Sequence, residues 1–159
     1  MALAAKLDNK DYRTYTVLGD GEVEEGQVWE AAMFAAHYGL DNLVAVVDWN
    51  GLQIDGNNDD VMTVKPIDEK LKAFGFNVLV IDGHNFEEIF AAFDAARACK
   101  GKPTAIIAKT HKGHGVSFME DQAGWHGKAP DVEQTAQALE ELERAMDAAK
   151  GKMGGSDVR

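Results

Sequence analysis

Short apolar runs alternate along this chain with longer segments in which apolar residues recur at helical spacing. Runs of this length that are rich in β-branched residues are typical of buried strands, whereas the longer period is that of an amphipathic helix. The predicted strands cover residues 14–18, 43–47, 78–81 and 104–108. The predicted helices cover residues 1–7, 24–38, 66–74 and 131–150, with a further helix that begins after Asn85.

The alternation of strands and helices predicts the fold class. Strand–helix–strand units connect through right-handed crossovers, so the pattern indicates an α/β fold with a mostly parallel sheet and helices on both faces. The uninterrupted apolar run from Leu43 to Val47 fits a strand that is covered on both sides. One domain is expected over residues 1–150, followed by a flexible tail at residues 151–159.

Aromatic residues in the predicted helices are interpreted as packing residues rather than cofactor contacts. Phe86, Phe90 and Phe93 recur with Ile89 at helical spacing after Asn85, which predicts one apolar stripe toward the core. Trp29 in the helix at 24–38 is interpreted in the same way.

The balance of charges disfavours several classes of protein. The 159 residues carry a formal net charge of -11, which argues against binding to duplex nucleic acid or to an anionic membrane surface. No apolar run approaches the roughly 20 residues that span a bilayer. Cys99 is the only cysteine, so no internal disulfide can form. We therefore expect a cytoplasmic protein that binds neither nucleic acid nor membrane.

Polar residues gather in the loops that follow the predicted strands, at residues 19–23, 48–60 and 109–130. Ligands bind at the carboxyl ends of the strands in sheets of this kind. Gly19, Asp20 and Gly21 stand at one such end, where glycines let the backbone approach an anion. The acidic side chains there would repel a phosphate unless a divalent cation intervened, and Asn50 can reach the same edge as Asp20. Gly-Asp-Gly alone is equally compatible with an ordinary turn.

A longer set of motifs resembles the thiamine diphosphate motif of transketolases. It covers roughly residues 1–130 and keeps its order throughout. The motifs are Gly19-Asp20-Gly21-Glu22, Glu25-Gly26-Gln27-Val28-Trp29-Glu30, Val46-Val47-Asp48-Trp49-Asn50, Ile54-Asp55-Gly56, Asp82-Gly83-His84, Lys109-Thr110-His111-Lys112-Gly113 and Trp125-His126-Gly127. A lone Gly-Asp-Gly would be a weak signal, whereas this ordered set is specific. One departure is Trp49, where related motifs often have Asp or Asn.

The resemblance implies a cofactor and a metal. Asp20 and Asn50 would bind Mg²⁺ through side-chain oxygens, and Leu52 would bind it through its backbone carbonyl. The ion would bridge to the diphosphate of thiamine diphosphate. The implied cofactor-binding residues are Gly19, Asp20, Gly21, Glu22, Asn50, Leu52 and His126.

His126 and Glu25 have an implied part in catalysis. His126 matches a histidine that faces cofactor and substrate, where it could bind the diphosphate or move protons; a solvated loop histidine is the alternative. Glu25 and Glu30 resemble glutamates that couple cofactor sites across a dimer interface. Their alternative is a solvated acidic face at a helix N-terminus, where negative charge is favourable.

The resemblance also implies a function that needs a partner. Transketolases transfer a two-carbon ketol unit between sugar phosphates, and a C-terminal, pyrimidine-binding domain completes the site. Because some members are split, we expect that domain as a partner subunit, together with homo-association through this domain. The chain starts in the middle of a family helix, so an N-terminal segment is expected to be missing and the chain to be inactive alone. A deoxyxylulose-phosphate synthase-like fragment and a non-catalytic cofactor-binding or interaction module are the alternatives.

Overall fold

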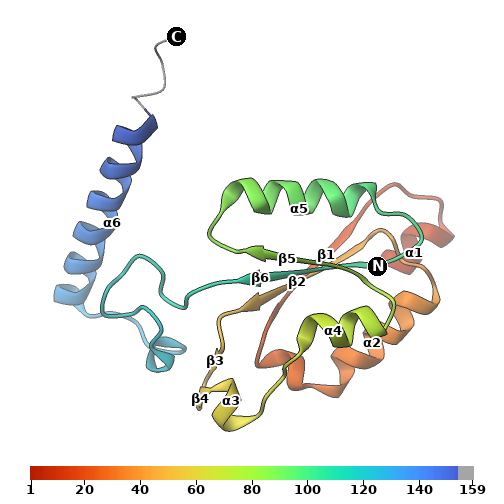
Figure 1. Ribbon diagram of the computed structural model, residues 1–159, viewed down its shortest axis with the longest axis horizontal. Helices are drawn as coiled ribbons and strands as arrows, with labels where there is room; N and C mark the ends of the chain where they lie inside the picture. Colours follow the sequence, from red (N-terminus) through yellow and green to blue (C-terminus); the bar gives the residue numbers. More distant parts are fainter. Residues whose placement is uncertain (154–159) are drawn as a thin grey trace. The chain divides into compact units, whose positions relative to one another are not determined.

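A four-stranded parallel sheet organises residues 1–110 (Figure 1). The computed structural model describes residues 1–153. Its sheet has the order β1-β2-β6-β5, with the strands β1 (Thr14–Gly19), β2 (Leu43–Trp49), β5 (Asn77–Asp82) and β6 (Thr104–Lys109). Each strand contains the apolar run that predicted it, and all neighbouring pairs are parallel. The predicted α/β fold is confirmed.

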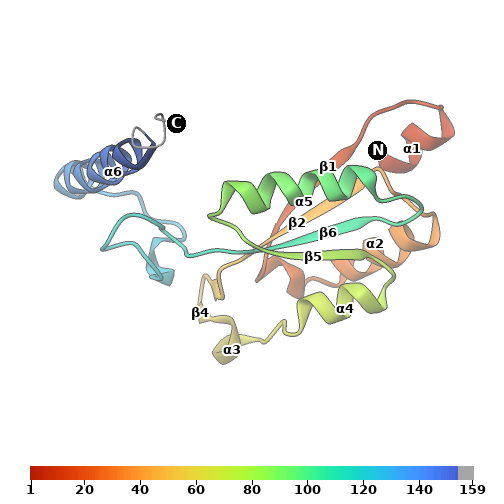
Figure 2. The ribbon, with the colours of Figure 1, turned by 45° about the horizontal axis from the view of Figure 1, so that its top comes forward.

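Helices cover both faces of the sheet, as the alternation predicted. Helices α2 (Gly26–His37) and α4 (Ile67–Ala73) lie on one face, and α5 (Phe86–Ala98) lies on the other (Figures 1 and 2). The short α1 (Ala2–Leu7) matches the predicted N-terminal helix and adds a buried alanine to the cluster formed by α2 and α4.

The core consists of two apolar clusters, one on each face of the sheet. Val47 and Ile107 belong to the cluster under α2 and α4, whereas Val44 and Ile106 belong to the cluster under α5. Successive side chains of a strand point to opposite faces, which explains this division. The strand β6 is buried from Thr104 to Ala108, so it lies at the centre of both clusters.

The contact face of α5 differs from the predicted aromatic stripe. Its buried residues are Ala92 and Ala96, whereas Phe86 and Phe90 are 71% and 67% exposed. The small alanine side chains let the helix approach the sheet closely, and the partly buried Phe93 packs against the same cluster. The prediction of packing is therefore wrong for Phe86 and Phe90.

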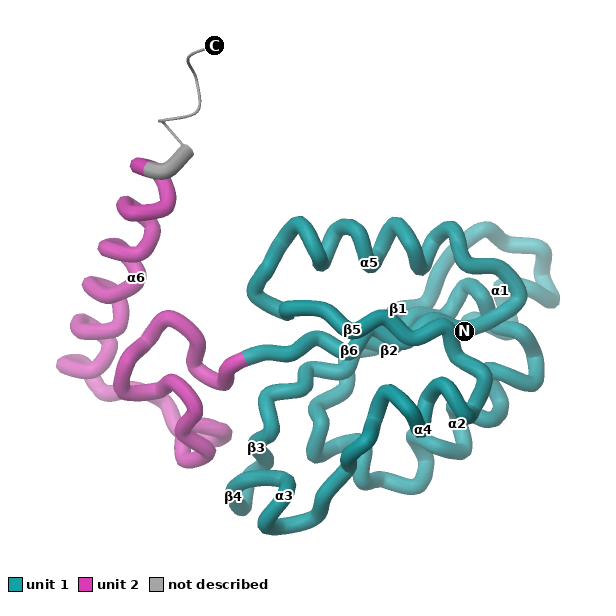
Figure 3. The backbone as a smooth tube through the Cα atoms, viewed as in Figure 1, with its two compact units in different colours: residues 1–110 teal, residues 111–159 magenta. Residues whose placement is uncertain are grey.

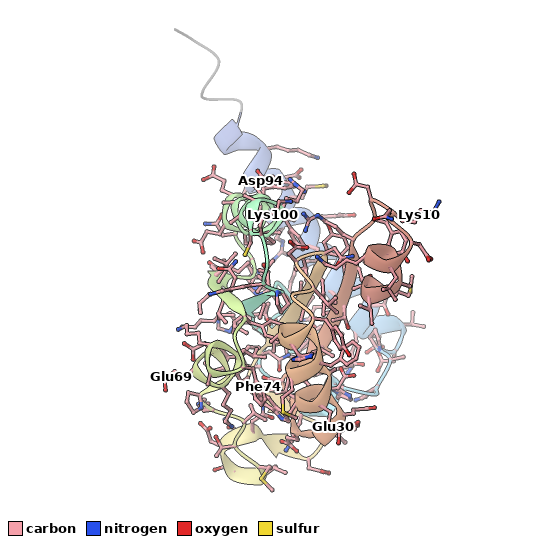
Figure 4. All side chains as sticks on the ribbon, turned by 90° about the vertical axis from the view of Figure 1, so that its right-hand side faces the viewer. Lys10, Glu30, Glu69, Phe74, Asp94 and Lys100 are labelled. Carbon is pink, nitrogen blue, oxygen red and sulfur yellow. The ribbon has the colours of Figure 1, made fainter. Side chains whose placement is uncertain are left out.

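Trp29 is a packing residue, as predicted. Its ring stacks on Phe74 with a centroid separation of 5.5 Å, and its indole N–H donates to the Val23 carbonyl at 2.9 Å. Figure 4 shows Phe74 beside α2, whereas Glu30 and Glu69 point away from α2 and α4. The tryptophan therefore ties α2 to the turn that precedes it.

The polar segment predicted as a loop at residues 48–60 has more structure than expected. Strands β3 (Leu52–Gln53) and β4 (Gly56–Asn57) form an antiparallel pair, and the short α3 (Asn58–Val61) follows. The side chain of Asn57 accepts a hydrogen bond from the N–H of Asp59 at 2.8 Å and so caps α3. Another short element, the 3-10 helix η1 (Glu22–Glu24), connects β1 to α2.

The chain divides into two compact units, and Figure 3 colours them separately. The first unit is residues 1–110 and contains the sheet. The second begins at residue 111 and contains the 3-10 helix η2 (Ala123–Trp125) and α6 (Val132–Met153). Residues 154–159, most of the predicted tail, lie outside the described residues. Within residues 1–153, no helix combines the length and the apolar composition needed to span a membrane.

Candidate functional site

Asp20 is a buried carboxylate at the carboxyl edge of the sheet. It follows β1 directly and is 1% exposed. One carboxylate oxygen accepts a hydrogen bond from the N–H of Gly21 at 2.8 Å, and the other accepts one from the N–H of Gly51 at 2.5 Å. Each oxygen keeps a further lone pair, so the carboxylate is held in place while it can still bind a cation.

Residues 50–52, which we call the donor turn, follow β2 and meet Asp20. Gly51 has a φ of 78°, a left-handed conformation that favours glycine. The side-chain oxygen of Asn50 accepts a hydrogen bond from the N–H of Leu52 at 3.0 Å, and the Gly51 carbonyl accepts one from the N–H of Asn58 at 2.9 Å. Gly51 stands between Asn50 and Leu52, and its N–H donates to Asp20. The three residues predicted as metal ligands are thus connected through Gly51.

Gly21 permits a close approach between the turn after β1 and the hairpin after the donor turn. A Cβ at Gly21 would lie 2.9 Å from Cβ of Gln53 and 3.0 Å from its side-chain oxygen. Any larger residue would therefore push against β3. This steric requirement, rather than an unusual backbone angle, accounts for the second glycine of the motif.

Glu22 lies against the same turn and contacts its backbone. Its carboxylate accepts a hydrogen bond from the N–H of Gly19 at 3.1 Å. That amide was among the groups predicted to contact a diphosphate. In this structure Glu22 satisfies it, so a diphosphate that used the Gly19 amide would have to displace the Glu22 side chain.

The three residues predicted as metal ligands would offer oxygen atoms of three kinds. A carboxylate, an amide oxygen and a backbone carbonyl are hard ligands, which suit Mg²⁺ or Ca²⁺ better than zinc. Within residues 1–153, no group of three or more His, Cys, Asp or Glu side chains could hold a metal ion. The predicted ligand set is of a different kind, because only one of its members is a carboxylate.

His126 belongs to the second unit, in the segment 111–131 that we call the histidine loop. Its Nδ1 lies 3.3 Å from the ammonium nitrogen of Lys112. An ammonium group can only donate, so Nδ1 is the acceptor and Nε2 is left as the donor. Sequence reasoning did not single out Lys112, although it stands in the predicted Lys-Thr-His-Lys-Gly motif.

Several side-chain contacts hold the histidine loop together. His111 pairs with Asp121, and His114 pairs with Glu120. Glu141 of α6 accepts hydrogen bonds from the N–H and the hydroxyl of Ser117, at 2.6 and 2.7 Å. The Ser117 N–H, then the Gln137 amide and the Ser117 hydroxyl, lower the pKa of Glu141 below its ordinary value.

Glu25 lies at the N-terminus of α2, as predicted. It is exposed, and its carboxylate accepts a hydrogen bond from the side-chain amide of Gln27 at 2.5 Å. Glu30 is also exposed on α2. These positions fit both an interface role and a solvated acidic face, so the coupling role stays a prediction.

Comparison with known proteins decides the family. The model of the family "Transketolase, thiamine diphosphate binding domain" matches residues 4–149. The chain belongs to the transketolase family. This confirms the predicted resemblance, and it supports thiamine diphosphate as the cofactor.

Two curated transketolase subunits and one solved transketolase illustrate the match. The chain is 44% identical to the 6-deoxy-6-sulfo-D-fructose transketolase subunit SqwG of Clostridium sp., over 91% of this chain and 52% of that one. It is 41% identical to an apulose-4-phosphate transketolase subunit of Phocaeicola vulgatus, over 98% and 55%. The transketolase of Campylobacter jejuni superposes with a TM-score of 0.81 at 33% identity, over 88% of this chain and 22% of that one. The chain thus spans about half the length of these curated subunits.

Proposed function

We propose that this chain is the diphosphate- and magnesium-binding part of a transketolase, which transfers a two-carbon ketol unit between sugar phosphates. The observation that carries the proposal is the junction of the buried Asp20 carboxylate with Gly51, at the centre of the donor turn. Membership of the family adds the cofactor, because the matching family is a thiamine diphosphate-binding domain.

Magnesium is the ion that this donor set suits best when a diphosphate shares its coordination. Mg²⁺ keeps octahedral oxygen coordination and is commonly held by a few protein oxygens together with substrate phosphates. Asp20 would supply a carboxylate oxygen, Asn50 its side-chain oxygen and Leu52 its backbone carbonyl. Gly19, Gly21 and Glu22 would then line the approach to the diphosphate.

Thiamine diphosphate, when bound, supplies the nucleophilic carbon that carries the two-carbon unit. The protein's own part is to bind the diphosphate and to place donors near the substrate. With Lys112 on its Nδ1, His126 would present an N–H on Nε2 to a phosphate or a substrate oxygen. We assign His126 to hydrogen-bond donation toward cofactor or substrate, and Glu25 to coupling between cofactor sites in a homo-oligomer.

A partner chain is part of the proposal. Two relatives bear names that describe them as transketolase subunits, which implies that each works with at least one other polypeptide. We propose that a C-terminal subunit supplies the pyrimidine-binding domain, and that sugar phosphates are the substrates of the assembled enzyme.

The test is a calorimetric titration of thiamine diphosphate into the chain, with and without Mg²⁺. We expect binding that requires Mg²⁺ and that Asp20→Ala reduces by more than about 100-fold, since it removes the only carboxylate of the set. Asp11→Ala, an exposed carboxylate before β1, is the matched control and is expected to bind like wild type. Binding that is independent of Mg²⁺, or is retained by Asp20→Ala, would reject the assigned metal site.

Reconstitution with the C-terminal subunit then tests the activity. Turnover with ketose phosphate donors supports a transketolase. Decarboxylation of pyruvate instead would favour a deoxyxylulose-phosphate synthase, and cofactor binding without turnover would favour a non-catalytic binding module.

A further inference from the structure

We propose that Thr110 and Asp48 are positioning residues that hold the donor turn against Asp20. This inference rests on the proposed function, because it concerns the same metal site. Neither residue is a ligand in that proposal; each acts through the backbone it fixes.

Thr110 fastens the end of β2 to the end of β6. Its hydroxyl donates a hydrogen bond to the carboxylate of Asp48, and its backbone N–H donates to the Trp49 carbonyl at 3.1 Å. These two bonds involve consecutive residues of β2, immediately before Asn50. One threonine therefore bonds to both residues that precede the donor turn.

Asp48 fastens the same strand end to Asp20. Its backbone carbonyl accepts a hydrogen bond from the N–H of Asp20 at 3.2 Å, and its neighbour in the register of β1 is Gly19. Asp48 consequently contacts the Asp20 backbone on one side and the Thr110 side chain on the other. Asp48 therefore links the position of the Thr110 side chain to Asp20 and to the donor turn.

Gly83 fixes the Thr110 side chain from the side of β5. A Cβ at Gly83 would lie 2.5 Å from the methyl carbon of Thr110 and 3.0 Å from the Lys109 carbonyl oxygen. The Gly83 N–H also donates to that carbonyl at 2.7 Å. The methyl group thus packs against the Asp82-Gly83-His84 turn, and the hydroxyl is left to point toward Asp48.

The chemistry of the pair favours a rigid contact. A hydroxyl that donates to a carboxylate makes a charge-assisted bond, which is stronger than a bond between neutral groups. Hydrogen bonds that orient metal ligands without touching the metal commonly change its affinity by about 10- to 100-fold when removed. Without the hydroxyl, the end of β2 would lose its side-chain bond to Thr110 and keep only the backbone bond at Trp49, immediately before Asn50.

The experiment compares Thr110→Val, which keeps the shape but loses the hydroxyl, with Thr110→Ser, which keeps the hydroxyl. Hydrogen exchange of the Gly51 and Asp20 amides is measured first, without ligand, so this arm does not depend on the metal site. We expect Thr110→Val to speed exchange of both amides by about 10-fold and Thr110→Ser to resemble wild type. The amide of Lys70 in α4, bonded to Pro66, should be unchanged in both variants and serves as the internal control.

Mg²⁺-dependent titration of thiamine diphosphate is the second arm. Thr110→Val is expected to weaken binding by about 10-fold, with Thr110→Ser close to wild type. Equal exchange of the Gly51 amide in wild type and Thr110→Val would overturn the inference. So would equal acceleration at Lys70, which indicates general destabilisation. If wild type itself shows no Mg²⁺-dependent binding, the proposed function loses its support, and the exchange arm still decides the role of Thr110.

Asp48→Asn separates the hydrogen bond from the charge. The amide oxygen of asparagine can still accept from the Thr110 hydroxyl, but the bond is no longer charge-assisted, so the rate of exchange at Gly51 should lie between those of wild type and Thr110→Val. Exchange at Gly51 that is faster in Asp48→Asn than in Thr110→Val would contradict a positioning role that depends on this bond alone.

Discussion

The donor turn and the histidine loop are two regions with predicted functional residues, and they are built differently. At the donor turn, a backbone N–H donates to the buried Asp20 carboxylate. The strands that lead into Asp20 and into the turn, β1 and β2, pair with each other. In the histidine loop, exposed side chains such as His111 and Asp121 pair with one another. Exposed pairs of this kind contribute roughly 0–1 kcal/mol each.

The difference separates a fixed site from an adjustable one. A metal site needs its ligands within a few tenths of an ångström, which strand ends and backbone bonds can provide. A residue that meets a substrate must tolerate its arrival and departure, which exposed side chains can do. We therefore expect substitutions near Asp20 to act on cofactor affinity, and those in the histidine loop to act on local order and turnover.

Among the glycine substitutions, Gly21→Ala is expected to have the largest effect on cofactor binding. The added Cβ would meet Gln53 at 2.9 Å, and that contact involves the Cβ of Gln53 rather than the flexible end of its side chain. The strand β3 must shift, and Leu52 shifts with it. We expect Mg²⁺-dependent thiamine diphosphate binding to weaken by about 10- to 100-fold in a calorimetric titration.

Gly26→Ala is the matched control for that substitution. A Cβ at Gly26 would have no neighbour within 4 Å, so affinity should be unchanged. If Gly21→Ala bound the cofactor like Gly26→Ala, the donor turn would be more adjustable than its backbone bonds indicate.

Gly113→Ala tests whether the histidine loop, like the turn after β1, requires glycine at a particular position. Gly113 has a φ of 70°, and a Cβ there would lie 2.7 Å from the backbone of Met119. Strain of this kind costs about 1–3 kcal/mol. We expect faster hydrogen exchange at Asp121, whose N–H donates to the Lys112 carbonyl at 2.8 Å, but only a few-fold loss of cofactor affinity.

Gly124→Ala, where a Cβ would have no neighbour within 4 Å, is the control for this region. It should leave the exchange at Asp121 unchanged. A loss of affinity in Gly113→Ala as large as in Gly21→Ala would show that the two regions act as one site, and the distinction between them would fail.

The sequence predicted the fold well because strand and helix periods are local properties. It also placed Asp20 and Asn50 at one edge, since strand ends of a parallel sheet share that edge. The proposed ligand role of Leu52 came only from the resemblance, because a role played by a backbone carbonyl cannot be inferred from the pattern of side chains. The packing of α5 was predicted wrongly, because periodicity finds an apolar stripe at Phe86 and Phe90 but does not reveal that a face of small alanines packs more closely.

Contacts that depend on loop closure were beyond the sequence. The Thr110 hydroxyl meets a residue 62 positions away. Lys112 meets His126 across 14 positions of an irregular loop. No periodicity of the sequence relates the two members of such a pair, so these contacts can be identified only in the folded structure.

A fall in pH should loosen the histidine loop where it contacts α6. Cofactor affinity measured at neutral pH should depend little on this effect. The N–H of Ser117, followed by the Gln137 amide and the Ser117 hydroxyl, holds the pKa of Glu141 below its ordinary value. A carboxylate with a lowered pKa in the folded state contributes its stabilisation above the unfolded value, about 4.3, and loses it as the pH falls through the folded pKa. We expect the protection of the Ser117 amide against hydrogen exchange to decrease as the pH falls through the folded pKa of Glu141.

Glu141→Gln is the variant that isolates this effect. The glutamine keeps an acceptor for Ser117 but does not titrate, so protection at neutral pH should be weaker than in wild type and should stay constant as the pH falls. The Gly51 amide bonds to a different carboxylate in the first unit, so its exchange should be the same in wild type and Glu141→Gln. If Ser117 lost protection equally in both proteins, another group would be responsible, and the histidine loop would depend on acid through contacts other than Glu141.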